Sequence, residues 1–219
     1  MATLHPPLAP VPIKNRRVWR DLAKILSTIF NPFLTALALF VLLSHRAAFE
    51  GVNAQGIGEF WRLLFISTFF TSIGPMLFIF WLYATDRISD LDMSIREERE
   101  KVFFVFVMFY LAGTATLWLT GAPKLLVASL AGYTLATAVV QYITRYWKIS
   151  THAVGITAPL VALSLLYGQQ PLPFLVLIPM VCWARVYLRA HTVAQVVAGA
   201  VLATFSVGVF FWLFHIVTL

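Results

Sequence analysis

The stretch from Ala184 to Gln195 holds the side chains with the greatest capacity for chemistry in this sequence. It lies between two apolar runs and carries Arg185, Arg189 and His191. Because a charged group at membrane depth is costly, such groups usually face partners or a water-filled site. A guanidinium clamps phosphate with two hydrogen bonds, and a neutral imidazole is a competent nucleophile. The stretch therefore predicts an anion site built on Arg185 and His191, whereas Arg189, one turn further, is expected to reach lipid head groups.

A second polar segment, Lys148 to His152, also combines phosphate-binding and acid–base residue types. Ser150 immediately precedes a predicted helix, so its hydroxyl can cap that helix. The free N–H groups at the same helix end can hold phosphate oxygens. We therefore expect Ser150 to bind phosphate and His152 to lie beside it.

A third segment, residues 86–101, alternates acidic and basic side chains. Pairs such as Asp92 and Arg96, four residues apart, are typical of a solvated interfacial helix. Arg96 and Arg99 are nevertheless candidates for a phosphate site. Two predicted membrane spans separate each polar segment from the next, so all three are expected at one face of the membrane.

The third signature of the type 2 phosphatidic acid phosphatase family, the lipid phosphate phosphatases, resembles the first of these stretches. The family has Ser-Arg-x5-His-x3-Asp, and here Arg185 and His191 match. Ala184 stands in place of the Ser and Gln195 in place of the Asp. Neutral Gln195 can accept a hydrogen bond from the imidazole, but it brings no charge.

The other two segments resemble the remaining signatures of that family less closely. Ser150 and His152 match two positions of Pro-Ser-Gly-His. Arg99 matches the Arg of Lys-x6-Arg-Pro, with Asp92 at the Lys position and Glu100 at the Pro position. The resemblance covers about residues 86–200.

This resemblance implies an enzyme that hydrolyses a phosphate monoester or diphosphate of a lipid, glycerolipid or isoprenoid, without metal or cofactor. It implies a phosphohistidine intermediate and the following roles for residues of this chain: nucleophile His191, general acid His152, orienting residue Gln195, and phosphate ligands Arg185, Ser150 and Arg99, with Arg96 in place of the missing cation.

Three alternatives stay open on the sequence. A decayed phosphatase would bind anionic lipid without turnover, because the Asp and Lys of the family are missing. Asp86, Asp90 and Asp92 resemble, weakly, the Asp-rich magnesium–diphosphate motif of membrane prenyltransferases. His152 and His191, on different helices, could instead ligate a haem or a metal.

The elements that position these residues are membrane-spanning helices. The chain has 219 residues, of which 60% are hydrophobic and 11% charged, which is typical of a polytopic membrane protein. We predict an all-α integral membrane helix bundle of six to seven transmembrane spans, with residues 1–21 as a flexible, Pro-rich and basic tail and residues 22–219 as one transmembrane domain. Seven apolar runs fit the required ~20 residues or somewhat fewer, at about 22–44, 60–85, 102–121, 124–144, 152–168, 171–190 and 192–218.

The distribution of basic residues predicts the orientation. With the N-terminus in the cytoplasm, 13 of the 16 Lys and Arg residues fall on the cytoplasmic side, as the positive-inside rule requires. The net charge of +7 then reflects this asymmetry rather than a nucleic-acid partner. We expect a cell-membrane protein with its N-terminus and polar segments in the cytoplasm, and the sequence leaves its oligomeric state open.

Overall fold

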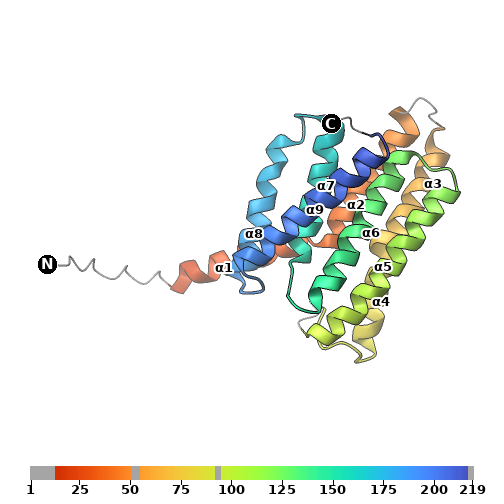
Figure 1. Cartoon of the computed structure of the whole chain (residues 1–219). Helices are drawn as coiled ribbons and strands as arrows, with labels where there is room; N and C mark the ends of the chain where they lie inside the picture. Colours follow the sequence, from red (N-terminus) through yellow and green to blue (C-terminus); the bar gives the residue numbers. More distant parts are fainter. Residues whose placement is uncertain (1–12, 51–54, 92–94, 217–219) are drawn as a thin grey trace.

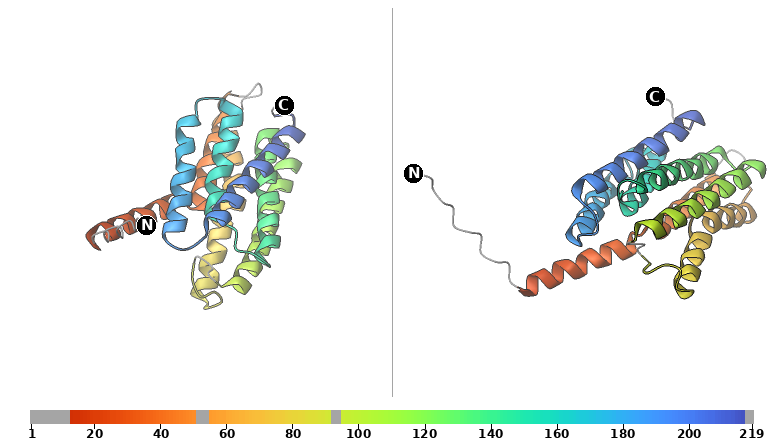
Figure 2. Two further views of the ribbon diagram at one scale, coloured as in Figure 1. Left: turned by 60° about the vertical axis from the view of Figure 1, so that its left-hand side comes forward. Right: turned by 60° about the horizontal axis from the view of Figure 1, so that its bottom comes forward.

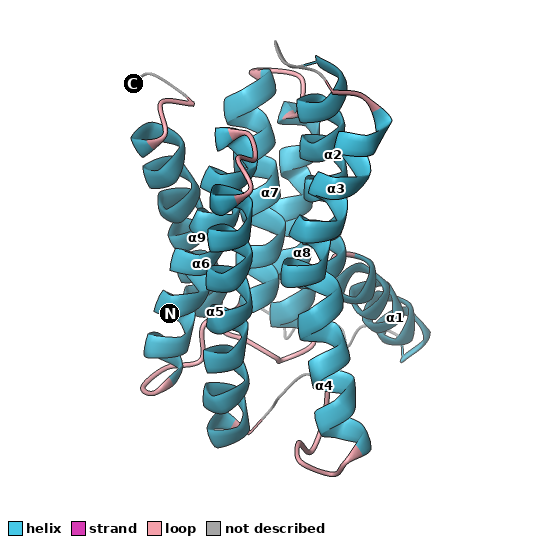
Figure 3. Cartoon of the chain, turned by 90° about the vertical axis from the view of Figure 1, so that its right-hand side faces the viewer, coloured by secondary structure: helices cyan, strands magenta, loops and turns pink. Residues whose placement is uncertain are grey.

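A computed structural model describes residues 13–50, 55–91 and 95–216. Within these ranges the regular elements are all helices, which confirms the predicted all-α class (Figures 1 and 3). They are α1 (Ile13–Ile29), α2 (Pro32–His45), η1 (Arg46–Glu50), α3 (Ile57–Thr68), η2 (Phe69–Ile73), α4 (Gly74–Ala84), α5 (Arg96–Leu119), α6 (Lys124–Thr144), α7 (Thr151–Tyr167), η3 (Leu172–Val176), α8 (Leu177–Tyr187) and α9 (Val193–Leu213).

Five helical stretches of the described part are long and apolar enough to cross a membrane. They are Pro32–Glu50, Ile57–Ala84, Glu97–Leu119, Lys124–Thr144 and Val193–Leu213. Two shorter apolar helices, Thr151–Tyr167 and Leu172–Tyr187, complete the bundle. The chain is therefore an integral membrane helix bundle, and its helices are consistent with the predicted six to seven spans.

The first predicted span, at about 22–44, has the wrong bounds, because the chain breaks between α1 and α2 and the span runs over Pro32–Glu50. Asn31 ends the continuity: its Oδ1 accepts hydrogen bonds from the N–H groups of Phe33 and Leu34, both at 3.0 Å. Pro32 occupies the first helical position, where its missing N–H costs nothing. The break also corrects the predicted tail, since α1 begins at Ile13. Residues 1–12 lie outside the described part.

Helix α1 lies apart from the bundle that the other helices form. Figure 2 shows it projecting away from one end of the bundle. Its inner side packs against α8, where Trp19 and Trp183 meet edge to face with ring centroids 5.9 Å apart. Its outer side exposes Leu22 and Ile25 among other apolar residues.

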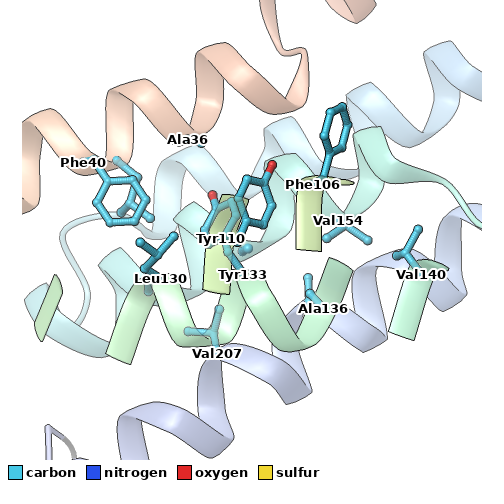
Figure 4. Close-up of a cluster of buried hydrophobic side chains, with 14 of the residues drawn as sticks. Ala36, Phe40, Phe106, Tyr110, Leu130, Tyr133, Ala136, Val140, Val154 and Val207 are labelled. Atoms are coloured by element: carbon cyan, nitrogen blue, oxygen red, sulfur yellow. The ribbon is translucent and has the colours of Figure 1, made fainter. Parts of the chain in front are cut away.

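The core of the bundle is apolar and closely packed. Phe40, Leu130 and Val207, from three different helices, are each at most 1% exposed and belong to one buried cluster (Figure 4). Where α7 and α9 cross, a Cβ on Gly199 would lie 2.7 Å from the carbonyl oxygen of Ser150. Glycine therefore permits a close approach there that no other residue would allow without displacement.

Three connections meet at the end of the bundle where α1 lies. These are the α4–α5, α6–α7 and α8–α9 connections, and the described C-terminal end of the chain lies at the opposite end (Figures 1 and 2). The three polar segments of the sequence fall on these connections or beside them. The fold thus brings to one end the residues that the sequence had separated by about a hundred positions.

Candidate functional site

A cavity of about 910 Å³ lies among the helices at this end of the bundle. Its lining divides into a polar and an apolar group. The polar group includes five cations, two imidazoles and a hydroxyl: Lys24, Arg99, Lys148, Arg185, Arg189, His152, His191 and Ser27. The apolar and aromatic group includes Phe33, Met76, Ile79, Phe80, Phe103, Phe106, Tyr110, Tyr133 and Val140. No carboxylate is among the described residues that line it, so the cavity suits an anion attached to an apolar body.

The turn that ends α8 brings Arg185 and His191 together. Arg189 adopts a left-handed conformation (φ 55°), the position that glycine usually takes in a helix-terminating Schellman motif. The carbonyl of Arg185 then accepts the N–H groups of Ala190 at 3.0 Å and His191 at 3.3 Å. Both Arg185 and His191 are only 7% exposed. The spacing of five residues between them is therefore the length of one helix-closing turn.

Arg189 is exposed and contributes to the lining of the cavity. The contact of its side chain with lipid head groups stays a prediction.

Gln195 belongs to the start of α9. Thr192 and Gln195 form a capping box: the Gln195 Oε1 accepts the N–H of Thr192 at 2.9 Å, and the Thr192 Oγ1 accepts the N–H of Gln195 at 3.4 Å. The Nδ1 atom of His191 has no hydrogen-bond partner among the described residues. The Gln195 amide oxygen therefore stabilises the helix end next to His191, and its role in orienting the imidazole stays a prediction.

His191 lies outside the membrane-spanning segments in a strongly positive environment. Burial lowers the pKa of its imidazole to about 4, and the charges of Arg99, Arg185 and Lys148 act in the same direction. A side-chain hydrogen bond between Gln195 and His191 opposes this lowering of the pKa to a lesser extent. His191 is consequently neutral near pH 7, which is the form a nucleophile requires.

Helix α7 carries the second imidazole. Ser150 is its N-cap, with Oγ accepting the N–H of Ala153 at 3.3 Å. Ser150 is fully buried and does not belong to the cavity lining, so the structure uses its hydroxyl as a cap. His152, the second residue of α7, lines the cavity. It hydrogen-bonds the backbone of Ser27, and its Nδ1 has no partner among the described residues.

Arg99 links α5 to the segment that precedes α7. Its Nη2 donates to the carbonyl oxygen of Ile149 at 2.7 Å, and the side chain is 4% exposed. This bond holds the guanidinium at the cavity wall, and the phosphate-binding role of Arg99 stays a prediction. Arg96 begins α5, and its side chain lies outside the described part. The phosphate-binding role predicted for it stays a prediction.

The structure adds cavity residues that the sequence analysis did not single out. Ser27 accepts a hydrogen bond from Nη1 of Arg185 at 2.6 Å, and Lys24 lies one turn earlier on α1. Lys148 belongs to the second polar segment but had no role assigned to it. The signal for Lys148 was its position two residues before Ser150, whereas no local pattern marks Ser27.

The described acidic residues of the third segment do not line this cavity. Asp86 and Asp90 do not line it, and Glu98 accepts the N–H and hydroxyl of Ser89 at 3.0 and 2.7 Å. Asp92 is outside the described residues. Within the described part, no group of three or more His, Cys, Asp or Glu side chains is placed to hold a metal ion.

A comparison with known protein families finds a match in the C-terminal part of the chain. Residues 122–218 match the family model of the PAP2 superfamily, which confirms the resemblance that the sequence motifs indicated. The matched region contains α6 to α9 and with them His152, Arg185 and His191. The curated proteins and the solved structures contain no match to this chain.

Proposed function

We propose that this membrane protein, whose residues 122–218 belong to the PAP2 superfamily, is a phosphatase that hydrolyses a lipid phosphate through a phosphohistidine. The PAP2 region supports phosphatase-type activity. One observation carries the finer proposal: Arg99, Arg185, His152 and His191 line the same cavity, which also has an apolar wall.

Arg185 and Arg99 would bind the phosphate. Both guanidinium groups are nearly buried, and each is fixed by a hydrogen bond of 2.6 or 2.7 Å to another part of the chain. A guanidinium held in this way can bind two phosphate oxygens in its plane and neutralise charge that develops in the transition state. Lys148 and Lys24 add positive charge to the same cavity.

His191 would attack phosphorus, and His152 would protonate the leaving group. The neutral imidazole of His191 forms a P–N bond while the P–O bond to the lipid breaks. Protonated His152 gives its proton to the departing oxygen, so that the lipid leaves as an alcohol. Water then attacks the phosphohistidine and loses a proton to His152, and cleavage of the P–N bond releases phosphate and restores both histidines.

The apolar wall of the cavity supports a lipid substrate. Phe33, Phe80, Phe103 and Phe106 lie on α2, α4 and α5 and line the cavity with the cations. Phe106 and Tyr110, both labelled in Figure 4, stack with ring centroids 6.4 Å apart, and both line the cavity. An acyl or isoprenyl chain would lie against these rings, whereas a small soluble phosphate ester would leave them uncovered.

A second candidate is a phosphatase-like protein that binds anionic lipid without turnover. Two observations favour it: Gln195 stands where the family has an acidic residue, and the described lining of the cavity contains no carboxylate. Such a protein would retain phosphate affinity through Arg185 and Arg99 and would lose hydrolysis alone.

Release of inorganic phosphate by the purified protein tests the proposal. The protein is incubated in detergent with phosphatidic acid, an isoprenyl diphosphate and a soluble phosphate monoester, each with and without chelator. We expect release from at least one lipid, insensitivity to chelator and loss of release in His191→Ala. Binding of lipid phosphate without any release would support the second candidate instead.

A further inference from the structure

Ser27 on α1 touches two of the residues on which the proposed function rests. Arg185 donates from Nη1 to Ser27 Oγ at 2.6 Å, and His152 hydrogen-bonds the backbone of the same residue. Arg185 lies on α8 and His152 on α7, so a single position of α1 connects both to a third helix. Ser27 itself lies outside the region matched by the PAP2 family, which begins at residue 122 and contains both of its partners.

The position of Ser27 is fixed by the packing of α1. Ser27 is 6% exposed, and Ala23 and Leu26 beside it are buried in a cluster with Ala184 of α8. Polar residues of the same helix, Lys24 among them, line the cavity. Helix α1 is therefore a wall of the cavity, held against the helix that carries Arg185.

We infer that Ser27 is a positioning residue for phosphate binding, and that α1 through it forms part of the phosphate site. This inference rests on the proposed function of the same cavity. The arginine side chain has several rotatable bonds, and a hydrogen bond to a buried hydroxyl restricts them before substrate arrives. The hydroxyl thus orients the guanidinium plane of Arg185, while the Ser27 backbone holds His152.

The two contacts predict different effects of substitution. Ser27→Ala removes the hydroxyl bond to Arg185 and keeps the backbone bond to His152. Phosphate binding should therefore weaken more than the chemical step. Ser27→Thr keeps the hydroxyl and should restore binding. Ser206→Ala is the matched control, because Ser206 is fully buried and lies outside the cavity lining.

The experiment measures kcat and KM for the lipid phosphate that is hydrolysed best, and the affinity for inorganic phosphate by equilibrium binding. We expect Ser27→Ala to raise KM and to weaken phosphate binding by about tenfold, with kcat changed by less than about threefold. Ser27→Thr and Ser206→Ala should behave as the unmodified protein does. Thermal midpoints of all variants are recorded alongside.

The outcomes distinguish a positioning role of Ser27 from no role in phosphate binding. Ser27→Ala with unchanged KM and phosphate affinity would overturn it, as would an equal loss in Ser27→Ala and a folded Ser27→Thr. If Ser27→Thr does not fold, the comparison of Ser27→Ala with Ser206→Ala decides. An unmodified protein that binds phosphate but releases none contradicts the proposed hydrolysis alone, and the phosphate affinities still test Ser27. A protein that binds no phosphate overturns both.

Discussion

At the residue scale, local spacing accounts for the part of the site that the sequence predicted. Arg185 and His191 are joined by one helix-ending turn, so their separation along the chain fixes their proximity in space. Ser27 is 158 residues from Arg185, and no periodicity connects the two. For Ser150 the sequence predicted one role and missed another fact. Its role as the cap of α7 was predictable, but its absence from the cavity lining depends on how α7 and α9 pack.

Arg185→Lys should reduce kcat/KM by about 100-fold, because lysine lacks the planar pair of donors that binds two phosphate oxygens. Arg87→Lys is the control, since Arg87 is exposed and outside the cavity lining. Initial rates of phosphate release measure both variants. Equal rates for Arg185→Lys and the unmodified protein would exclude Arg185 from the phosphate clamp.

The neutral state of His191 predicts a low acidic limit of activity. With a pKa of about 4, the imidazole of the free enzyme is protonated, and unable to attack, only below about pH 4. The acidic limb of log kcat/KM should therefore lie well below the ordinary histidine value of ~6.5. A full pH–rate profile measures it, and a limb near pH 6.5 would show that His191 is not buried among cations during catalysis.

Gln195→Asp should shift this limb to higher pH. A carboxylate one turn from His191 favours the imidazolium form and raises its pKa, and it also stabilises a cationic phosphohistidine. We expect activity to be kept or raised near pH 7. Gln195→Leu removes the capping oxygen as well as the amide beside His191, and should nearly abolish activity. Unchanged activity in Gln195→Leu would mean that the imidazole is oriented by another group.

At the element scale, the break between α1 and α2 is the main feature that the sequence analysis missed. The residues on both sides of Asn31 are mostly apolar, so the hydropathy pattern predicts one continuous membrane span. The two hydrogen bonds from Phe33 and Leu34 to Asn31, together with Pro32, start a new helix. Helix α1 thereby projects from the end of the bundle, and the residues of its inner side contribute to the lining of the cavity. The other spans were predicted to within several residues at their ends.

Helix α1 should lie in the interface of the membrane. Its outer side exposes Val18, Leu22, Ile25 and Ile29 at three- to four-residue spacing, with Arg17 and Arg20 exposed beside them. This combination is typical of interfacial amphipathic helices. A fluorophore on Ile25→Cys, in a Cys182→Ser background, should be quenched by lipids brominated on their acyl chains. A fluorophore on Gln169→Cys, in an exposed connection, should not be quenched. Equal quenching at the two positions would contradict this placement.

The crossing of α7 and α9 should tolerate no side chain at Gly199. A Cβ there would lie 2.7 Å from the Ser150 carbonyl and 3.1 Å from the Ala153 Cβ, so Gly199→Ala must separate the helices that carry His152 and follow His191. We expect a loss of about 1–3 kcal/mol of stability and weaker phosphate binding. Gly208→Ala, with no neighbour within 4 Å, should be neutral or slightly stabilising. Thermal unfolding in detergent compares the two variants.

At the scale of the whole molecule, the bundle has one strongly positive end and an opposite end where Arg46 and Arg62 are paired with Glu50 and Glu59. Composition alone predicted the membrane bundle, because 60% of the residues are hydrophobic. The gathering of Arg99, Lys148 and Arg185 around one cavity required the packing of α5 to α8. This end carries most of the cations of the chain, so the charges that set the orientation of the protein and those that line the cavity lie at the same end.

The positive end of the bundle should therefore face the cytoplasm, and the cavity should open toward the cytoplasmic leaflet. The positive-inside rule acts on Lys and Arg in and beside short connections. The α6–α7 connection carries Arg145 and Lys148, and Arg87 lies in the α4–α5 connection. Single cysteines at Arg87 and Tyr146, both exposed, test this in a Cys182→Ser background. In intact cells an impermeant maleimide should leave both unlabelled and should label Gln169→Cys at the opposite end. All three should react after permeabilisation. Labelling of the first two from outside, with Gln169→Cys protected, would invert the orientation and move the site of phosphate release to the outer face.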